Sequence, residues 1–346
     1  MKTLVMAMGM IATAAAFALP TAPYAVQNCA GYNSWPMMQA IGRRLVCTYS
    51  RGTGHSIGEG VRGVYSRASD DCGLTWRPEV CIVDESDRGE VTVGKGLDSS
   101  GAMLLWVRSI KGGNYRHDLY RSRDGETWTT LATPSLSPAP IQITDVFTVP
   151  GKGLMALWFA GDYNADGGHS WGVVTSTDDG RTWTQRTVAA DLATADWPTE
   201  QSVVFVGDGK LLGIGRTELG NGQRQFQLQS SDSGETWTCQ LTNISDTWSS
   251  TPSLIYDAQT GLVNHYYFQR GKGLVKRRAN TLASVWDHPT AWAEPEVVGV
   301  GSTSTWDTGN ANATLVGRTH FIAYYSGLAP NTAIYALPVR AAGMNE

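Results

Sequence analysis

Four segments that end in tryptophan recur along this chain at nearly constant spacing. Three are complete octets of the pattern Ser-x-Asp-x-Gly-x-Thr-Trp, at residues 69–76, 176–183 and 230–237, and a shortened copy covers residues 122–128. Their tryptophans stand at positions 76, 128, 183 and 237, so the steps are 52, 55 and 54 residues. A fixed period of this size is typical of a protein built from one repeated supersecondary unit.

Each octet has the composition of a turn followed by a strand. A short Asp side chain accepts backbone N–H bonds within a turn, and Gly supplies the positive φ that such a turn needs. Thr and Trp favour the half-buried strand that follows. We therefore interpret the octets as structural, with the Trp filling space between neighbouring sheets, and do not count their Asp residues as catalytic.

A second repeat lies between the octets and consists of a Gly turn, a short apolar strand and often an arginine. It occurs six times, and its strands end at residues 51, 108, 160, 216, 270 and 326. With 39 glycines and no long helical periodicity, the chain is predicted to be all-β. We predict a six-bladed β-propeller with four antiparallel strands per blade and strands shared between the first and last blades; an open solenoid, the alternative, needs polar caps.

The repeat runs through the chain without a linker, which predicts a single propeller domain over residues 26–346. Residues 1–25 hold one basic residue, an apolar run and small residues, as a signal peptide or an N-terminal extension does. We therefore expect a secreted or periplasmic protein whose mature chain is not stably inserted in a membrane. Of the five cysteines, Cys72 and Cys81 are close enough in sequence to form a bridge.

The net charge and the motifs indicate which partners and cofactors to expect. The formal net charge is −4, which argues against nucleic acid as a binding partner. The sequence has no Cys-x-x-Cys and no His-x-x-x-His, so we predict no metal and no cofactor.

The repeats place charged residues at equivalent positions around the predicted axis. Four strand ends carry an arginine, namely Arg51, Arg108, Arg216 and Arg270. A second set is spaced by 55 residues and consists of Glu90, Asp145 and Glu200; the same step leads to Trp35 and Asn310. Clustered guanidiniums favour a bound anion, since charge-assisted hydrogen bonds are the strong ones. The alternative interpretation is an internal salt-bridge network that keeps the channel shut.

These residues resemble the sialidase/neuraminidase superfamily, whose Asp boxes (BNR repeats) the octets match. The stretch from Trp197 to Arg216 is similar to the segment that carries the family's catalytic Glu and second arginine. The resemblance implies these roles for Glu200 and Arg216, with Arg270 as the third arginine and Arg51 as the first. It also implies that the arginines hold the carboxylate of sialic acid while the glycosidic bond is cleaved.

The chain departs from the exo-acting members of that superfamily. Residues 308–313 stand where a nucleophilic Tyr is expected, and His55 and Glu59 are the candidates for the leaving-group proton where an Asp is expected. Phage tailspike endosialidases, which cut polysialic acid, are similar in keeping an early His, one Glu and two arginines without the Tyr. Because of that likeness, the alternative to a secreted or periplasmic protein is a component of a phage virion tail.

We therefore predict a sialidase-type glycosidase that cleaves terminal or internal sialic acid linkages, with a sialylated glycan or another acidic carbohydrate as its partner. Further substrate-binding residues are predicted to be Arg108, Glu90, Asp145 and Tyr267. The alternatives are a non-catalytic sialoglycan-binding propeller, a phage-type endosialidase acting on polysialic acid, and a hydrolase or lyase for a different acidic sugar.

Overall fold

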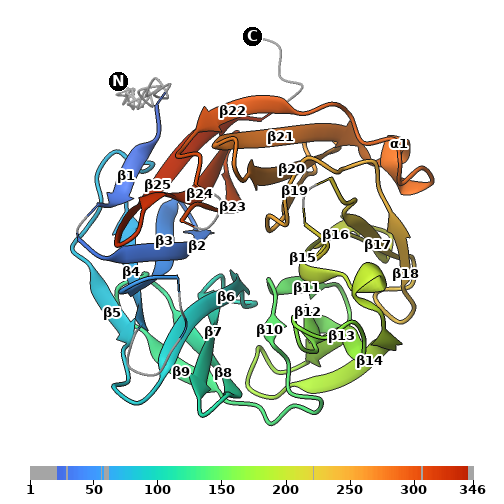
Figure 1. The fold of residues 1–346 in the computed structure, drawn as a ribbon, viewed down its shortest axis with the longest axis horizontal. Helices are drawn as coiled ribbons and strands as arrows, with labels where there is room; N and C mark the ends of the chain where they lie inside the picture. The colour runs from blue at the N-terminus through green and yellow to red at the C-terminus, as the bar shows by residue number, and fades with distance from the viewer. Residues whose placement is uncertain are drawn as a thin grey trace, which may run out of the picture.

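The computed structural model describes residues 22–28, 30–55, 57, 62–220, 222–304 and 307–341. The predicted all-β fold is confirmed: the strands form sheets that stand around one central axis as a propeller (Figure 1). Residues 1–21 of the predicted leader lie outside the described residues. No helix in the described part of the chain has the length and apolar character to cross a membrane.

Five hydrogen-bonded sheets are found in the described chain. One four-stranded sheet comprises β6 (Gly89–Leu97), β7 (Met103–Lys111), β8 (Asn114–Ser122) and β9 (Thr129–Ala132). A second comprises β15 (Thr199–Gly207), β16 (Lys210–Arg216), β17 (Phe226–Ser230) and β18 (Thr238–Leu241). A third comprises β19 (Ser253–Asp257), β20 (Leu262–Gln269), β21 (Leu274–Thr281) and β22 (Glu296–Val300). The five-stranded sheet comprises β10 (Gln142–Ile143), β11 (Phe147–Val149), β12 (Gly153–Ala160), β13 (His169–Ser176) and β14 (Thr184–Leu192). The helical elements among the described residues are a 3-10 turn, η1 (Thr194–Asp196), and one short helix, α1 (Leu282–Trp286).

The largest sheet joins the two ends of the chain. Its eight strands are β23 (Gly309–Val316), β24 (Thr319–Leu328), β25 (Asn331–Arg340), β2 (Tyr32–Ile41), β3 (Arg44–Gly52), β4 (Arg62–Ser69), β5 (Val80–Val83) and β1 (Tyr24–Gln27). Strand β1 pairs antiparallel with β25, whereas β2 meets β25 through one parallel pair, Tyr32 with Thr332. The expected sharing of strands between the ends is therefore confirmed, and the number of blades stays a prediction.

The octets form the turns expected of them. In the second complete copy, Ser176 Oγ accepts the Gly180 N–H at 2.8 Å, and Asp178 accepts both the N–H and the hydroxyl of Thr182. The Trp183 ring then packs edge-on against Trp106 of the neighbouring sheet, with ring centroids 5.2 Å apart. The octet thus closes a turn and fills the space between two sheets, which is a structural role.

Side chains near the axis link the inner strands to one another. Ser202, Ser253 and Asn312 each accept a backbone N–H from another inner strand, namely β19, β23 and β2, at 2.8–3.0 Å. The first two bonds join separate sheets, and the third joins β2 to β23 within the eight-stranded sheet, so together they fix the positions of the inner strands that surround the axis. The four described cysteines are free, so the predicted bridge between Cys72 and Cys81 is not formed.

Candidate functional site

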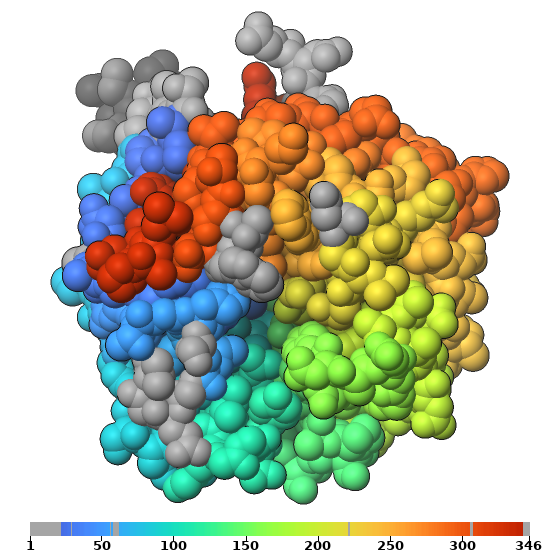
Figure 2. Space-filling view, in the orientation of Figure 1, coloured from blue at the N-terminus to red at the C-terminus, as the bar shows by residue number. Residues whose placement is uncertain are grey.

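A cavity of about 530 Å³ opens near the axis. Figure 2 shows the face hollowed near its centre, where blue, teal and green parts of the chain meet. The polar residues that line the cavity include His55, Thr92, Arg108, Gln142, Tyr163, Glu200, Arg216, Glu218, Ser249, Thr251, Arg270, Asn310 and Asn312. They come from sheets far apart in sequence, so the cavity exists only because the propeller brings its inner strands together.

One wall of the cavity holds a carboxylate–guanidinium–carboxylate group. Arg216, at the end of β16, donates to Glu200 Oε1 through Nη1 at 2.7 Å and to Glu218 Oε2 through Nη2 at 3.0 Å. The Thr251 hydroxyl donates to the other oxygen of Glu200, and the Thr199 hydroxyl donates to Glu218. Arg216 therefore already has two carboxylate partners, and Glu200 is held in one orientation.

The electrostatics of this wall keep Glu200 ionised. Burial on its own raises the pKa of a carboxyl group, but the charges of Arg216 and Arg270 and the hydrogen bond from Thr251 outweigh it. The pKa of Glu200 consequently lies below its ordinary value. At neutral pH Glu200 is a carboxylate that can accept a proton.

Arg270 lies beside this group and has no carboxylate partner among the described residues. Its Nη2 donates to Asn310 Oδ1 at 3.1 Å, while its buried Nε has no hydrogen-bond partner. Gly309, at φ +134°, lets the guanidinium lie against the backbone, because a Cβ there would be 3.0 Å from Nε. Glycine is thus required where Arg270 enters the cavity.

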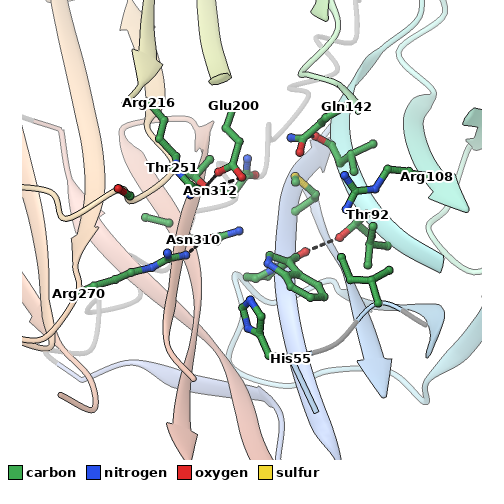
Figure 3. Close-up of a pocket in the computed structure, with 18 of the residues that line it drawn as sticks. His55, Thr92, Arg108, Gln142, Glu200, Arg216, Thr251, Arg270, Asn310 and Asn312 are labelled. Carbon is green, nitrogen blue, oxygen red and sulfur yellow. Dashed lines mark hydrogen bonds and ion pairs between the residues drawn. The ribbon is translucent and has the colours of Figure 1, made fainter. Parts of the chain in front are cut away.

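The facing wall carries a third guanidinium. Figure 3 shows Arg108, Gln142 and Thr92 across the cavity from Arg216, Glu200 and Arg270. Arg108 is buried on β7, donates through Nη1 to the Ile141 carbonyl at 3.0 Å, and leaves Nε without a partner. With three guanidiniums against two carboxylates, the described lining carries one net positive charge when His55 is neutral.

His55 and an apolar surface complete the lining. The Tyr32 hydroxyl lies 2.8 Å from His55 Nδ1, and the Trp35 ring packs edge-on against the imidazole. Pro36, Met37, Ile57, Val91, Val93 and Ala311 supply the apolar part of the wall. The cavity therefore offers both charged groups and an apolar face to a ligand.

Three of the lining residues share an unusual backbone conformation. Trp35, Glu200 and Asn310 have φ of 48°, 42° and 50°, and each lies at a register shift in the innermost strand of its sheet. A non-glycine residue at positive φ costs about 1–3 kcal/mol and is often found at functional sites. These are positions linked by the 55-residue step, so the repeat builds the same side-chain-presenting bulge three times.

Several residues predicted for the site lie elsewhere. Arg51 does not line the cavity, because its guanidinium pairs with Glu79 at 2.7 Å and covers the Tyr65 ring at 4.0 Å. Tyr267 is fully buried, donates its hydroxyl to Asp246 and is likewise outside the lining. Neither side chain is placed to touch a ligand in this cavity.

The two other predicted carboxylates are also absent from the lining. Glu90 is fully buried and accepts the Glu85 N–H; burial raises its pKa to about 7. Asp145 accepts the Lys95 N–H at 3.0 Å, which links two sheets. Glu59 lies outside the described residues. The structure thus brings together five predicted residues, namely His55, Arg108, Glu200, Arg216 and Arg270.

Sequence reasoning missed Glu218, Thr251, Gln142, Tyr163 and Trp248. A signal existed for Glu218, because it stands two residues after Arg216 and side chains two apart on an extended chain face the same side. The other four lie on loops or at a short strand, where no repeat marks them. Within the described residues, no group of three His, Cys, Asp or Glu is placed to hold a metal ion.

No family model and no curated protein matches this chain. Solved structures do match. A protein of unknown function from Dyadobacter fermentans aligns with a TM-score of 0.74 at 17% identity, over 92% of this chain and 98% of that one. The NanB sialidase of Streptococcus pneumoniae aligns with a TM-score of 0.68 at 12% identity, over 91% of this chain and 70% of that one. The phage phi92 endosialidase aligns with a TM-score of 0.67 at 11% identity, over 94% of this chain and 70% of that one. At these identities the matches show a sialidase-like propeller fold.

Proposed function

We propose that this protein is a glycoside hydrolase that binds a sialic acid residue in the central cavity and cleaves its glycosidic bond. The observation that carries the proposal is a net positive cavity in which ionised Glu200 lies next to Arg216 and Arg270. A sugar that bears a carboxylate beside its anomeric carbon would place that carboxylate against the guanidiniums. Glu200 would then face the carbon where positive charge develops in the transition state.

Asn310 bears on the mechanism. It occupies the start of the last inner strand, where the exo-acting enzymes are expected to carry a nucleophilic Tyr, and its amide is held by Arg270. An amide forms no glycosyl intermediate, so we propose direct attack by water. Glu200 takes a proton from the water molecule while the water oxygen bonds to the anomeric carbon. As the glycosidic bond breaks, His55, which Figure 3 shows apart from Glu200, gives a proton to the departing glycosidic oxygen.

A second candidate is glycan binding without turnover. It is favoured by one observation, that both oxygens of Glu200 are already engaged, one by Arg216 and one by Thr251. Such a protein would bind sialosides through the same arginines and release nothing.

Incubation with α2,3-, α2,6- and α2,8-linked sialosides, followed by sizing of the products, tests the proposal. Free monosaccharide would indicate cleavage of terminal linkages and short oligomers cleavage of internal ones. Glu200→Gln should lower the rate by about 100-fold or more, as expected for loss of a general base, with an unchanged circular dichroism spectrum. Binding without products would favour the second candidate, and neither binding nor products would refute both.

We also propose that the eight-stranded sheet comprises two blades, which gives six in all. The single parallel pair of β2 with β25 separates two antiparallel groups, β2–β5 and β23–β25 completed by β1. For the location we propose secretion or the periplasm, with a phage virion tail as the alternative. N-terminal sequencing of the protein from its native source would distinguish a cleaved leader from a retained extension.

A further inference from the structure

Two buried guanidiniums line opposite walls of the cavity without a carboxylate. Within the described residues, neither Arg108 nor Arg270 takes part in an ion pair, and each has a buried Nε that lacks a hydrogen-bond partner. Both side chains belong to residues only 8% exposed. Arg216 differs from them, because Glu200 and Glu218 take both of its Nη atoms.

The surroundings of Arg108 do not balance its charge. The guanidinium lies 5.4 Å from the Tyr115 ring centroid and bonds to the neutral Ile141 carbonyl. His117, opposite Arg108 on β8, is buried, and burial together with the charge of Arg108 lowers its pKa to about 3, so it is neutral. A buried charge without a partner is costly unless an anion or water reaches it, and the cavity gives Arg108 that access.

Figure 3 shows Arg108 and Arg270 on facing walls of the cavity. A sugar whose carboxylate binds at Arg270, beside Glu200, therefore leaves Arg108 free to bind a second acidic group. We propose that Arg108 forms a second anion subsite, and that the preferred ligand is an acidic oligosaccharide with negative charges on consecutive sugars. One acidic group binds at Arg270, next to Glu200, and the next binds at Arg108. The carbon skeleton between them lies along Val91, Val93 and Met37. This inference rests on the proposed function.

The test compares three non-hydrolysable ligands by isothermal titration calorimetry. They are sialic acid, a sulfur-linked disialoside, and the same disialoside with the carboxylate of its second sugar converted to an amide. Wild-type protein should bind the dianion at least tenfold more tightly than its amide. Arg108→Gln should reduce that preference to less than threefold and leave the affinity for sialic acid within twofold. Arg121→Gln, which alters an arginine that is paired with Asp98 and lies outside the cavity lining, is the matched control.

Three outcomes would overturn the inference: equal binding of dianion and amide by the wild type, an equal loss for both in Arg108→Gln, or no binding of any acidic ligand. Binding of galacturonic acid and its dimer, measured in the same way, distinguishes failure of the second subsite from failure of the proposed function. If no sialoside binds but the uronate dimer is preferred over the monomer, and Arg108→Gln removes that preference, the second subsite stands and the proposed sugar is wrong.

Discussion

The charge state of Glu200 depends on a single neighbour, Arg216, more than on any other described group. Burial opposes ionisation of Glu200, and the guanidinium 2.7 Å away is the largest of the effects that offset it, ahead of the Thr251 hydrogen bond and the charge of Arg270. The pair is therefore coupled: removing the arginine makes ionisation of the buried carboxyl group less favourable. Glu218 shares the arginine and so keeps its planar group in position to hold Glu200.

This coupling predicts the pH dependence of activity. In the proposed mechanism ionised Glu200 is the active form; because its pKa lies below the ordinary value of 4.5, this requirement is met above pH 4.5, and activity is lost as the pH falls through the lowered pKa. In Arg216→Gln the acidic limb of kcat/KM should move to higher pH, because only Arg270 and the Thr251 hydroxyl then oppose the effect of burial on Glu200. A limb that stays in place in this variant would show that Glu200 is not the titrating base.

At the scale of single elements, the octet turns should contribute stability without contributing to the site. Ser176 is buried, accepts the Gly180 N–H at 2.8 Å and donates to Asp178. Ser176→Ala leaves that N–H without its partner and should lower the free energy of unfolding by about 1–3 kcal/mol, measured by urea denaturation. Exposed Ser231→Ala, in the next octet, should change it by less than about 0.5 kcal/mol. If the folded Ser176→Ala protein cleaved its substrate at a different rate from the wild type, a purely structural role for the octet would be contradicted.

Strand register explains how far the site could be predicted from the sequence. The repeats locate strand ends, and Arg216 and Arg108 were found in that way. In β16, Arg216 pairs with Thr199, the residue before the bulged Glu200, whereas in β3 the residue paired before the bulged Trp35 is Ser50. Arg51 is therefore one position out of register, and a slip of one residue turns a strand side chain to the other face. The difference comes from a second register shift in β15, between Phe205 and Gly207, that has no counterpart in β2 and that the period does not record, so the face of Arg51 is not predictable from the repeat.

For the whole molecule, closure of the ring depends on contacts between the two ends of the chain. Buried Thr332 donates its hydroxyl to the Asn33 carbonyl at 2.6 Å, and the Asn33 amide donates to the Thr332 carbonyl at 2.8 Å. Thr332→Val keeps the shape and removes one of these bonds, which should lower the free energy of unfolding by about 1–3 kcal/mol. Exposed Thr187→Val on β14 is the control and should have little effect. Equal effects of the two variants would argue that this junction does not hold the ring closed.

The architecture was easier to predict than the chemistry for a physical reason. A repeat reports the backbone unit, because every copy must form the same turns and strands. The site is built from what differs between copies: one inner bulge carries Trp35, another Glu200 and another Asn310. Thr251 bonds to Glu200, and Gln142 lines the same cavity, only once the fold brings their segments to the axis, and no local sequence pattern predicts either contact.

We propose that the acidic ligand binds at the axis, against Arg270, and not at the strand end that carries Arg51. Titration calorimetry of sialic acid against wild type, Arg270→Gln and Arg51→Gln tests it directly. We expect at least a tenfold loss of affinity in Arg270→Gln, since a buried charge-assisted contact is removed, and a change of less than twofold in Arg51→Gln. Unchanged affinity in Arg270→Gln, or a large loss in Arg51→Gln, would contradict it.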